Sequence, residues 1–145
     1  MKTIKFLIET TDNLAPLILR VPMGVIFSAH GAQKLFGWFG GYGLEGTGQF
    51  MASMGLNPGI VMAALAGSAE FFGGLALLLG ILTRPAAAVL AFTMLVALVS
   101  VHLSNGLFMA NNGYEFALAL LAMSLSIVVY GGGAFSLDRR LAKAW

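Results

Sequence analysis

Cysteine is missing from the sequence, and charged residues are scarce. None of the 145 residues is a cysteine, which excludes disulfides, thiol chemistry and iron–sulfur ligation by this chain. Any redox chemistry must therefore come from a bound cofactor or a partner. Charged residues make up only 10% of the chain and hydrophobic residues 59%, and the mean hydropathy is +0.89. Because a soluble domain carries about 25% charged residues, this composition indicates a membrane protein.

The sequence carries no signal for binding nucleic acid or a metal ion. The formal net charge is only +2, and no basic run of the kind that binds phosphate backbones occurs, so we expect no nucleic acid. No local metal motif such as H-E-x-x-H is present, and the eight methionines form no metal-binding repeat. We therefore expect neither a metal nor a thiol cofactor.

Four apolar runs occupy most of the chain, at about residues 14–36, 58–82, 85–104 and 114–131. Each is close to the ~20 residues that a helix needs to cross the hydrocarbon layer. No room remains for a soluble catalytic domain. The sequence therefore predicts an all-α membrane protein, a single transmembrane domain over residues 1–145 that forms a four-helix bundle in the lipid bilayer.

The basic residues predict the orientation of this bundle. With four spans, both termini and the turn near residue 84 share one side of the membrane. The basic residues on that side are Lys2, Lys5, Arg84, Arg139, Arg140 and Lys143, and the other side has Lys34 alone. The positive-inside rule then places both termini in the cytoplasm.

The connection between the first two spans, residues 37–57, is rich in glycine. Its stretch TGQFMASMGL predicts a short amphipathic helix after Thr47, which could lie at the membrane surface as a lid. Alternatively, Trp38, Phe39 and Tyr42 form an interfacial aromatic belt.

Ionisable residues occur within or at the edge of the apolar runs. At 1.5 Å rise per residue, His30 lies ~24 Å, His102 ~25 Å and Lys34 ~30 Å from the inner boundary. The two histidines are thus predicted at nearly the same height. Glu70 falls near the middle of the second span, and Glu115 opens the fourth on the outer side.

Glu70 needs a partner or a proton, because a charged group at mid-bilayer costs roughly 2.5 to 3.5 kcal/mol. Glycines and alanines three and four residues away place it on a face that packs closely against another helix. Two alternatives follow. Glu70 is protonated and hydrogen-bonded, or it pairs with a cation, either Arg20 from below or His30 or Lys34 from above.

A polar edge on the first span completes the candidate site, since His30, Gln33 and Lys34 are neighbours on one helix surface. The two histidines could be structural, ligate a b-type haem, hold a metal or hydrogen-bond a quinone. Bulky neighbours of His102 disfavour haem, and the mixed polar groups favour a pocket for a quinone-like ligand. Arg20 is either functional or a snorkelling anchor. The candidate ligand-binding residues are Arg20, His30, Gln33, Lys34, Glu70, His102 and Glu115.

Several stretches resemble the DoxX family of small bacterial membrane proteins. They are Arg20, His30-Gly31, Gln33 to Gly37, the EFFGG stretch at residues 70–74, and Ser136 to Asp138. The resemblance implies a four-helix protein of the bacterial inner membrane. Some relatives are linked to thiosulfate oxidation coupled to the quinone pool, and others to oxidoreductase assemblies that handle oxidative stress. The family offers no agreed catalytic residues.

The sequence therefore leads to one main hypothesis and two alternatives. The main one is a component of a quinone-linked oxidoreductase, in which His30 or His102 donates a hydrogen bond, Lys34 stabilises charge and Glu70 carries protons. A redox partner protein or a bound cofactor would supply electrons. The alternatives are a non-enzymatic scaffold or accessory subunit of such a complex, and a small transporter that would need a dimer. Small-residue helix faces also make homo-oligomers plausible.

Overall fold

The computed structural model describes residues 2–144, and 80% of the chain is helical. Within this described range no strand occurs, so the all-α prediction is confirmed. The principal helices are α1 (Lys2–Ile8), α2 (Leu14–Phe36), α3 (Gly43–Ser53), α4 (Gly59–Leu79), α5 (Thr83–Ala97), α6 (Glu115–Tyr130) and α7 (Leu137–Ala144).

Three helical runs are long and apolar enough to cross a membrane. They are α2, α4 and a continuous run Thr83–Asn105, in which a π-helical turn (Leu98–His102) and a 3-10 turn (Leu103–Asn105) extend α5. Helix α6 is equally apolar but shorter, with 16 residues. The four apolar runs of the sequence thus correspond to three candidate spans and one shorter helix.

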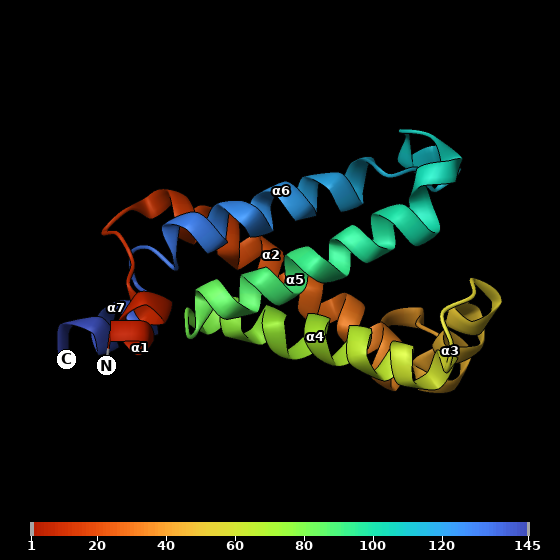
Figure 1. Cartoon of the computed structure of the whole chain (residues 1–145), viewed down its shortest axis with the longest axis horizontal. Helices are drawn as coiled ribbons and strands as arrows, with labels where there is room; N and C mark the ends of the chain where they lie inside the picture. Colours follow the sequence, from red (N-terminus) through yellow and green to blue (C-terminus); the bar gives the residue numbers. More distant parts are fainter. Residues whose placement is uncertain (1, 145) are drawn as a thin grey trace.

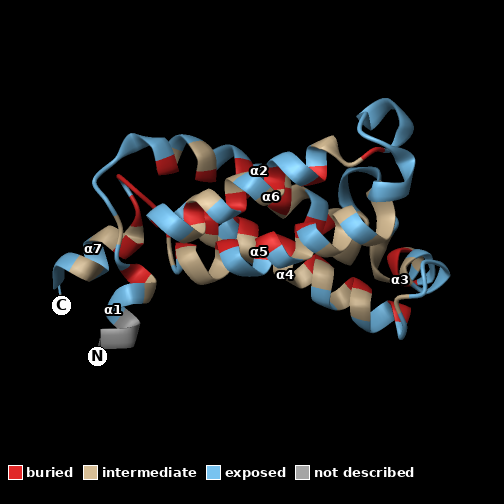
Figure 2. Cartoon of the chain, turned by 45° about the horizontal axis from the view of Figure 1, so that its top comes forward, coloured by how far each residue is buried: buried red, intermediate tan, exposed pale blue. Residues whose placement is uncertain are grey.

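The four long helices α2, α4, α5 and α6 run along the molecule, as Figure 1 shows. Helices α1 and α7 lie at one end with both termini, and α3 lies at the other. Buried residues face the centre of the bundle and exposed residues face outward (Figure 2). Many of the exposed residues are large and apolar, among them Ile18, Leu65, Phe72, Phe92 and Val129. A continuous apolar outer surface of this kind suits contact with lipid.

Helices α2 and α4 form the most extensive contact of the bundle, and glycines make it possible. A Cβ atom on Gly31 would lie 2.7 Å from the backbone oxygen of Gly67. A Cβ atom on Gly74 would lie 2.5 Å from the backbone nitrogen of Ser28. The two backbones therefore approach more closely than any larger residue would permit. Of the small residues predicted around Glu70, Gly67 and Gly74 pack on α2, whereas Gly73 lies against Leu90 of α5.

The predicted helix of the outer connection exists, but it begins earlier than expected. Helix α3 starts at Gly43, four residues before Thr47, and ends at Ser53. Thr47 is therefore a residue of the helix interior, and its side chain is buried. Gly48, the next residue, lies against the start of α4 at Ile60. Helix α3 consequently folds back onto α4 and α2.

Arg20 anchors the end of the bundle that carries the termini. Its side chain is only 1% exposed, so it does not reach toward the membrane surface as a snorkelling residue would. The guanidinium donates to five backbone oxygens at distances of 2.7 to 3.4 Å, those of Leu77, Leu78, Gly132, Ala134 and Phe135. These carbonyls belong to the end of α4 and to the connection between α6 and α7. Arg20 therefore ties three parts of the chain together.

Asp138 completes this anchor from α7. Its buried carboxylate accepts hydrogen bonds from the backbone nitrogens of Leu82 at 2.7 Å and Thr83 at 2.8 Å. It also accepts one from the Thr83 hydroxyl at 2.7 Å. A carboxylate at a helix start satisfies backbone donors that the helix itself leaves free. Asp138 thus caps α5 and fixes α7 to the turn between α4 and α5.

Replacing Arg20 by methionine tests this anchor. We expect Arg20→Met to lower the free energy of unfolding by about 3 kcal/mol or more, because buried carbonyls lose their donors. Unfolding in detergent micelles by titration with dodecyl sulfate would measure the loss. Arg140→Met is the matched control, because Arg140 is exposed, and it should change stability by less than about 0.5 kcal/mol. Similar values for the two variants would contradict the anchoring role.

Candidate functional site

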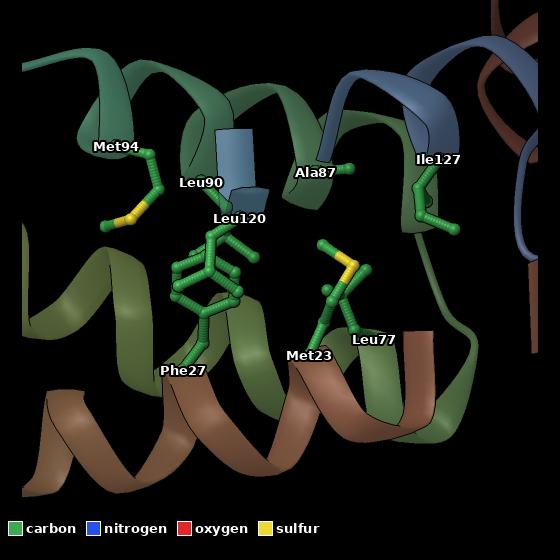
Figure 3. Close-up of a cluster of buried hydrophobic side chains, with 8 residues drawn as sticks. All are labelled: Met23, Phe27, Leu77, Ala87, Leu90, Met94, Leu120 and Ile127. Atoms are coloured by element: carbon green, nitrogen blue, oxygen red, sulfur yellow. The ribbon is translucent and has the colours of Figure 1, made fainter. Parts of the chain in front are cut away.

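A cavity of about 870 Å³ lies at the end of the bundle that carries α3. Residues of α2, α4, α5, α6 and α3 line it. Phe27, Met94 and Leu120 belong both to this lining and to the buried apolar cluster that Figure 3 shows. The cavity therefore adjoins the apolar core. Its volume falls within the roughly 300 to 1,000 Å³ of small-molecule sites.

An ion pair between α2 and α4 lies in the wall of this cavity. The Lys34 Nζ atom is 2.6 Å from Oε2 of Glu70, and both residues line the cavity. The Glu70 side chain is 4% exposed and that of Lys34 is 24% exposed. Of the three cations considered from the sequence, Lys34 is therefore the partner of Glu70.

His30 and Gln33 also line the cavity, from the same helix as Lys34. The His30 ring lies 6.3 Å from the ring of Phe116 on α6, measured between centroids. Gln33 donates from Nε2 to the backbone oxygen of Phe39 at 3.2 Å. Gln33 therefore holds the connection that leads into α3, whereas the His30 ring packs against an aromatic ring of α6.

His102 reaches the cavity from the π-helical turn that extends α5. Such turns insert an extra residue into a helix and often occur at functional sites. The His102 Nδ1 atom lies 2.9 Å from the backbone oxygen of Asn112. A carbonyl can only accept, so Nδ1 donates, and in the neutral ring Nε2 keeps a free lone pair. His102 in its neutral form therefore presents a hydrogen-bond acceptor to the site, and not the donor that the sequence led us to expect.

Two candidate residues lie outside the cavity. Arg20 is 14 positions before Lys34 on α2, ~21 Å away along the helix axis, and belongs to the anchor at the other end. Glu115 opens α6 and accepts a hydrogen bond from the backbone nitrogen of Met109 at 2.7 Å. Its carboxylate therefore fixes the loop before α6. The structure brings together the other five candidates, His30, Gln33, Lys34, Glu70 and His102.

Aromatic residues of the lining were not among the candidates. Tyr42 and Phe50 reach the cavity because α3 folds back over the bundle, and Phe116 reaches it from α6. The possible lid in residues 37–57 was the only sequence signal for the first two. Phe116 had none, because an aromatic residue near the start of an apolar run is indistinguishable from one that faces lipid.

Comparisons with known proteins agree with this architecture. A scan against protein families matches residues 15–103 to the family described as DoxX. The inner membrane protein YqjF of Escherichia coli is 36% identical over 92% of this chain and 97% of its own. The putative oxidoreductase CatD of Bacillus subtilis is 34% identical over 79% of each chain. A search of solved structures gives no significant match.

The unequal burial of Lys34 and Glu70 predicts that replacing each residue changes the stability of the protein by a different amount. Lys34→Met leaves the buried carboxylate without a partner and should lower the free energy of unfolding by about 3 kcal/mol. Glu70→Gln should cost only about 1 kcal/mol, because the amide oxygen still accepts and the more exposed ammonium can turn into the cavity. Unfolding in detergent micelles by titration with dodecyl sulfate measures the free energy of unfolding of both variants.

The double variant Lys34→Met/Glu70→Gln is the control for this pair. It leaves no buried charge, so it should be more stable than Lys34→Met alone. Additive losses in the double variant would show that the two side chains do not depend on each other.

Proposed function

Because this chain belongs to the DoxX family of bacterial inner-membrane proteins, we propose that it is the membrane component of a quinone-linked oxidoreductase system. In this proposal a quinone-like ligand binds in the cavity beside Lys34 and Glu70. The observation that carries it is a large, mainly apolar cavity with a few convergent polar groups, which is the usual form of a small-molecule site. The name of the relative CatD, a putative oxidoreductase, supports the class of reaction.

The polar groups of the cavity suit the two oxygens of a quinone ring. Lys34 carries three N–H donors, and only one is used by Glu70. The remaining donors would bind a carbonyl oxygen of the ligand. His102 Nε2 would accept from a hydroxyl group, which the reduced form of such a ligand carries. The site thus offers a donor and an acceptor for the two redox forms.

The apolar lining suits the ring itself. Phe116 and His30 pack against each other in the wall of the cavity, and Phe27 and Leu120 line it where it meets the core. Flat aromatic surfaces of this kind hold a ring by stacking and by exclusion of water. A quinone would supply the capacity to take up electrons and protons at its oxygens.

Glu70 would hold a proton for exchange with the ligand, and Lys34 would compensate the carboxylate when that proton has left. A carboxylate at mid-membrane keeps its charge only with such a partner. The electrons would come from a redox partner protein or from a cofactor bound by the assembly. The chain has no thiol to relay them.

We also propose that α6 crosses the membrane as a fourth span. Helix α6 packs along the length of α5, and its 16 residues extend ~24 Å. The loop before α6 would complete the crossing. Both termini would then be cytoplasmic, as the basic residues of α7, Arg84 and the amino-terminal lysines indicate.

Quinone binding can be measured directly. The protein, purified in mild detergent, should release quinone on solvent extraction and should bind a short-chain ubiquinol, kept reduced, in a titration. We expect His102→Leu to weaken this affinity about tenfold, because one hydrogen bond to the ligand is lost. Glu115→Gln, a change outside the cavity, should leave it within about twofold.

The wild-type result separates the proposal from its alternative. If the folded wild-type protein neither carries nor binds quinone, the oxidoreductase role is wrong and a scaffold role is favoured. If His102→Leu and Glu115→Gln lost the same amount of affinity for the ligand, the ligand would bind outside this cavity.

The orientation can be tested because the chain has no native cysteine. Single cysteines introduced as Asn111→Cys and Ala144→Cys lie in exposed positions at opposite ends of the bundle. In intact spheroplasts a membrane-impermeant maleimide should label Asn111→Cys and should label Ala144→Cys only after permeabilisation. Labelling of both in intact spheroplasts would contradict four spans with cytoplasmic termini.

A further inference from the structure

A second, smaller cavity lies at the opposite end of the bundle, beside α7. Its volume is about 250 Å³, and Phe135, Ser136, Arg139, Arg140 and Lys143 line it. Arg139 and Arg140 lie four and three positions before Lys143 on α7, so each arginine is a neighbour of Lys143 on the helix surface. The quinone proposal makes no use of this cavity.

Positive charge dominates this cavity. Arg139 forms an ion pair with Asp12. Among the side chains of residues 5–144, Arg140 and Lys143 have no ion-pair or hydrogen-bond partner. The positive-inside rule accounts for basic residues on this side of the membrane. It does not account for their convergence on one cavity.

An exposed aromatic ring lies at the edge of the same cavity. Phe135 is 77% exposed, and its backbone has a positive φ of 55°, a conformation that costs a non-glycine residue roughly 1 kcal/mol. The backbone oxygen of Phe135 accepts from Arg20, which holds this segment in place. The ring itself projects away from the core. Aromatic rings in such positions are typical of the interface between hydrocarbon and headgroups.

We propose that this cavity binds the phosphate group of an anionic phospholipid headgroup. Arg140 and Lys143 would neutralise the phosphate, as arginine and lysine commonly do, and Phe135 would contact the apolar part of the same lipid. Basic pockets at the membrane surface bind anionic headgroups in this way. A lipid is favoured over a soluble phosphate because charge and exposed apolar surface adjoin each other on a membrane protein.

Native mass spectrometry of the full-length protein provides the test. The protein would be released from nanodiscs that contain equal amounts of phosphatidylglycerol and phosphatidylcholine, and the retained lipids would be counted. We expect a preference for phosphatidylglycerol. Arg140→Gln/Lys143→Gln should weaken its apparent affinity about 25-fold, since each basic residue near an anionic surface contributes about fivefold.

Two control variants isolate the cavity from general charge effects. Lys2→Gln/Lys5→Gln removes the same net charge from α1 and should retain the preference. Arg140→Lys/Lys143→Arg keeps the charge in the cavity and should retain it too. The proposal would be overturned if Lys2→Gln/Lys5→Gln lost as much affinity for phosphatidylglycerol as the cavity variant does. It would also be overturned if the wild type showed no preference for phosphatidylglycerol.

A soluble ligand is distinguished by titration with inorganic phosphate. We expect millimolar phosphate to leave the thermal unfolding temperature of the detergent-purified protein unchanged. A different result would identify a soluble phosphate as the ligand and overturn the lipid. In that case phosphate would stabilise the wild type but not Arg140→Gln/Lys143→Gln, and the wild type would show no preference for phosphatidylglycerol.

Discussion

The close contact between α2 and α4 governs the rest of the structure. Gly31 lies against Gly67 and Phe71 with no space for a Cβ atom, and this approach sets the distance across which Lys34 and Glu70 meet. A charged group within a bilayer is stable only beside a partner or water. The glycines therefore do more than pack two helices. They bring a cation within 2.6 Å of a carboxylate that is almost fully buried.

Polar side chains are buried at both ends of the bundle, but they are satisfied in different ways. Arg20 uses its donors on backbone carbonyls, and Asp138 uses both oxygens on the start of α5. These groups have little capacity left for a ligand. Lys34 has one hydrogen bond and faces a cavity. The number of unused donors, more than burial alone, separates an anchor from a candidate binding residue.

The sequence was sufficient to predict the four long helices and part of the site. Apolar runs and the rise of a helix placed His30 and His102 at one height, and the structure places both on one cavity. The partner of Glu70 was among the predicted alternatives. Arg20 was harder to place, because its acceptors lie in residues 132–135. Their return to the start of α2 is a tertiary contact that no local pattern encodes.

The early start of α3 and the π-helical turn were beyond sequence reasoning for a similar reason. Helix α3 begins at Gly43 because its inner face meets α4, and His102 turns inward through an extra residue in its helix. Both features decide the cavity's shape. Side-chain chemistry was therefore predictable from position in the spans, whereas the enclosure of the cavity depended on packing between distant segments.

The ion pair also constrains how a ligand could bind. A ligand that had to break the pair would leave Glu70 charged and unpartnered in the wall between α2 and α4, at a cost of several kcal/mol. Lys34 avoids this conflict, because an ammonium group has three donors and Glu70 uses one. A carbonyl oxygen in the cavity can take another while the pair stays intact. The contact that holds the two helices together can thus remain in place while the same lysine binds a ligand.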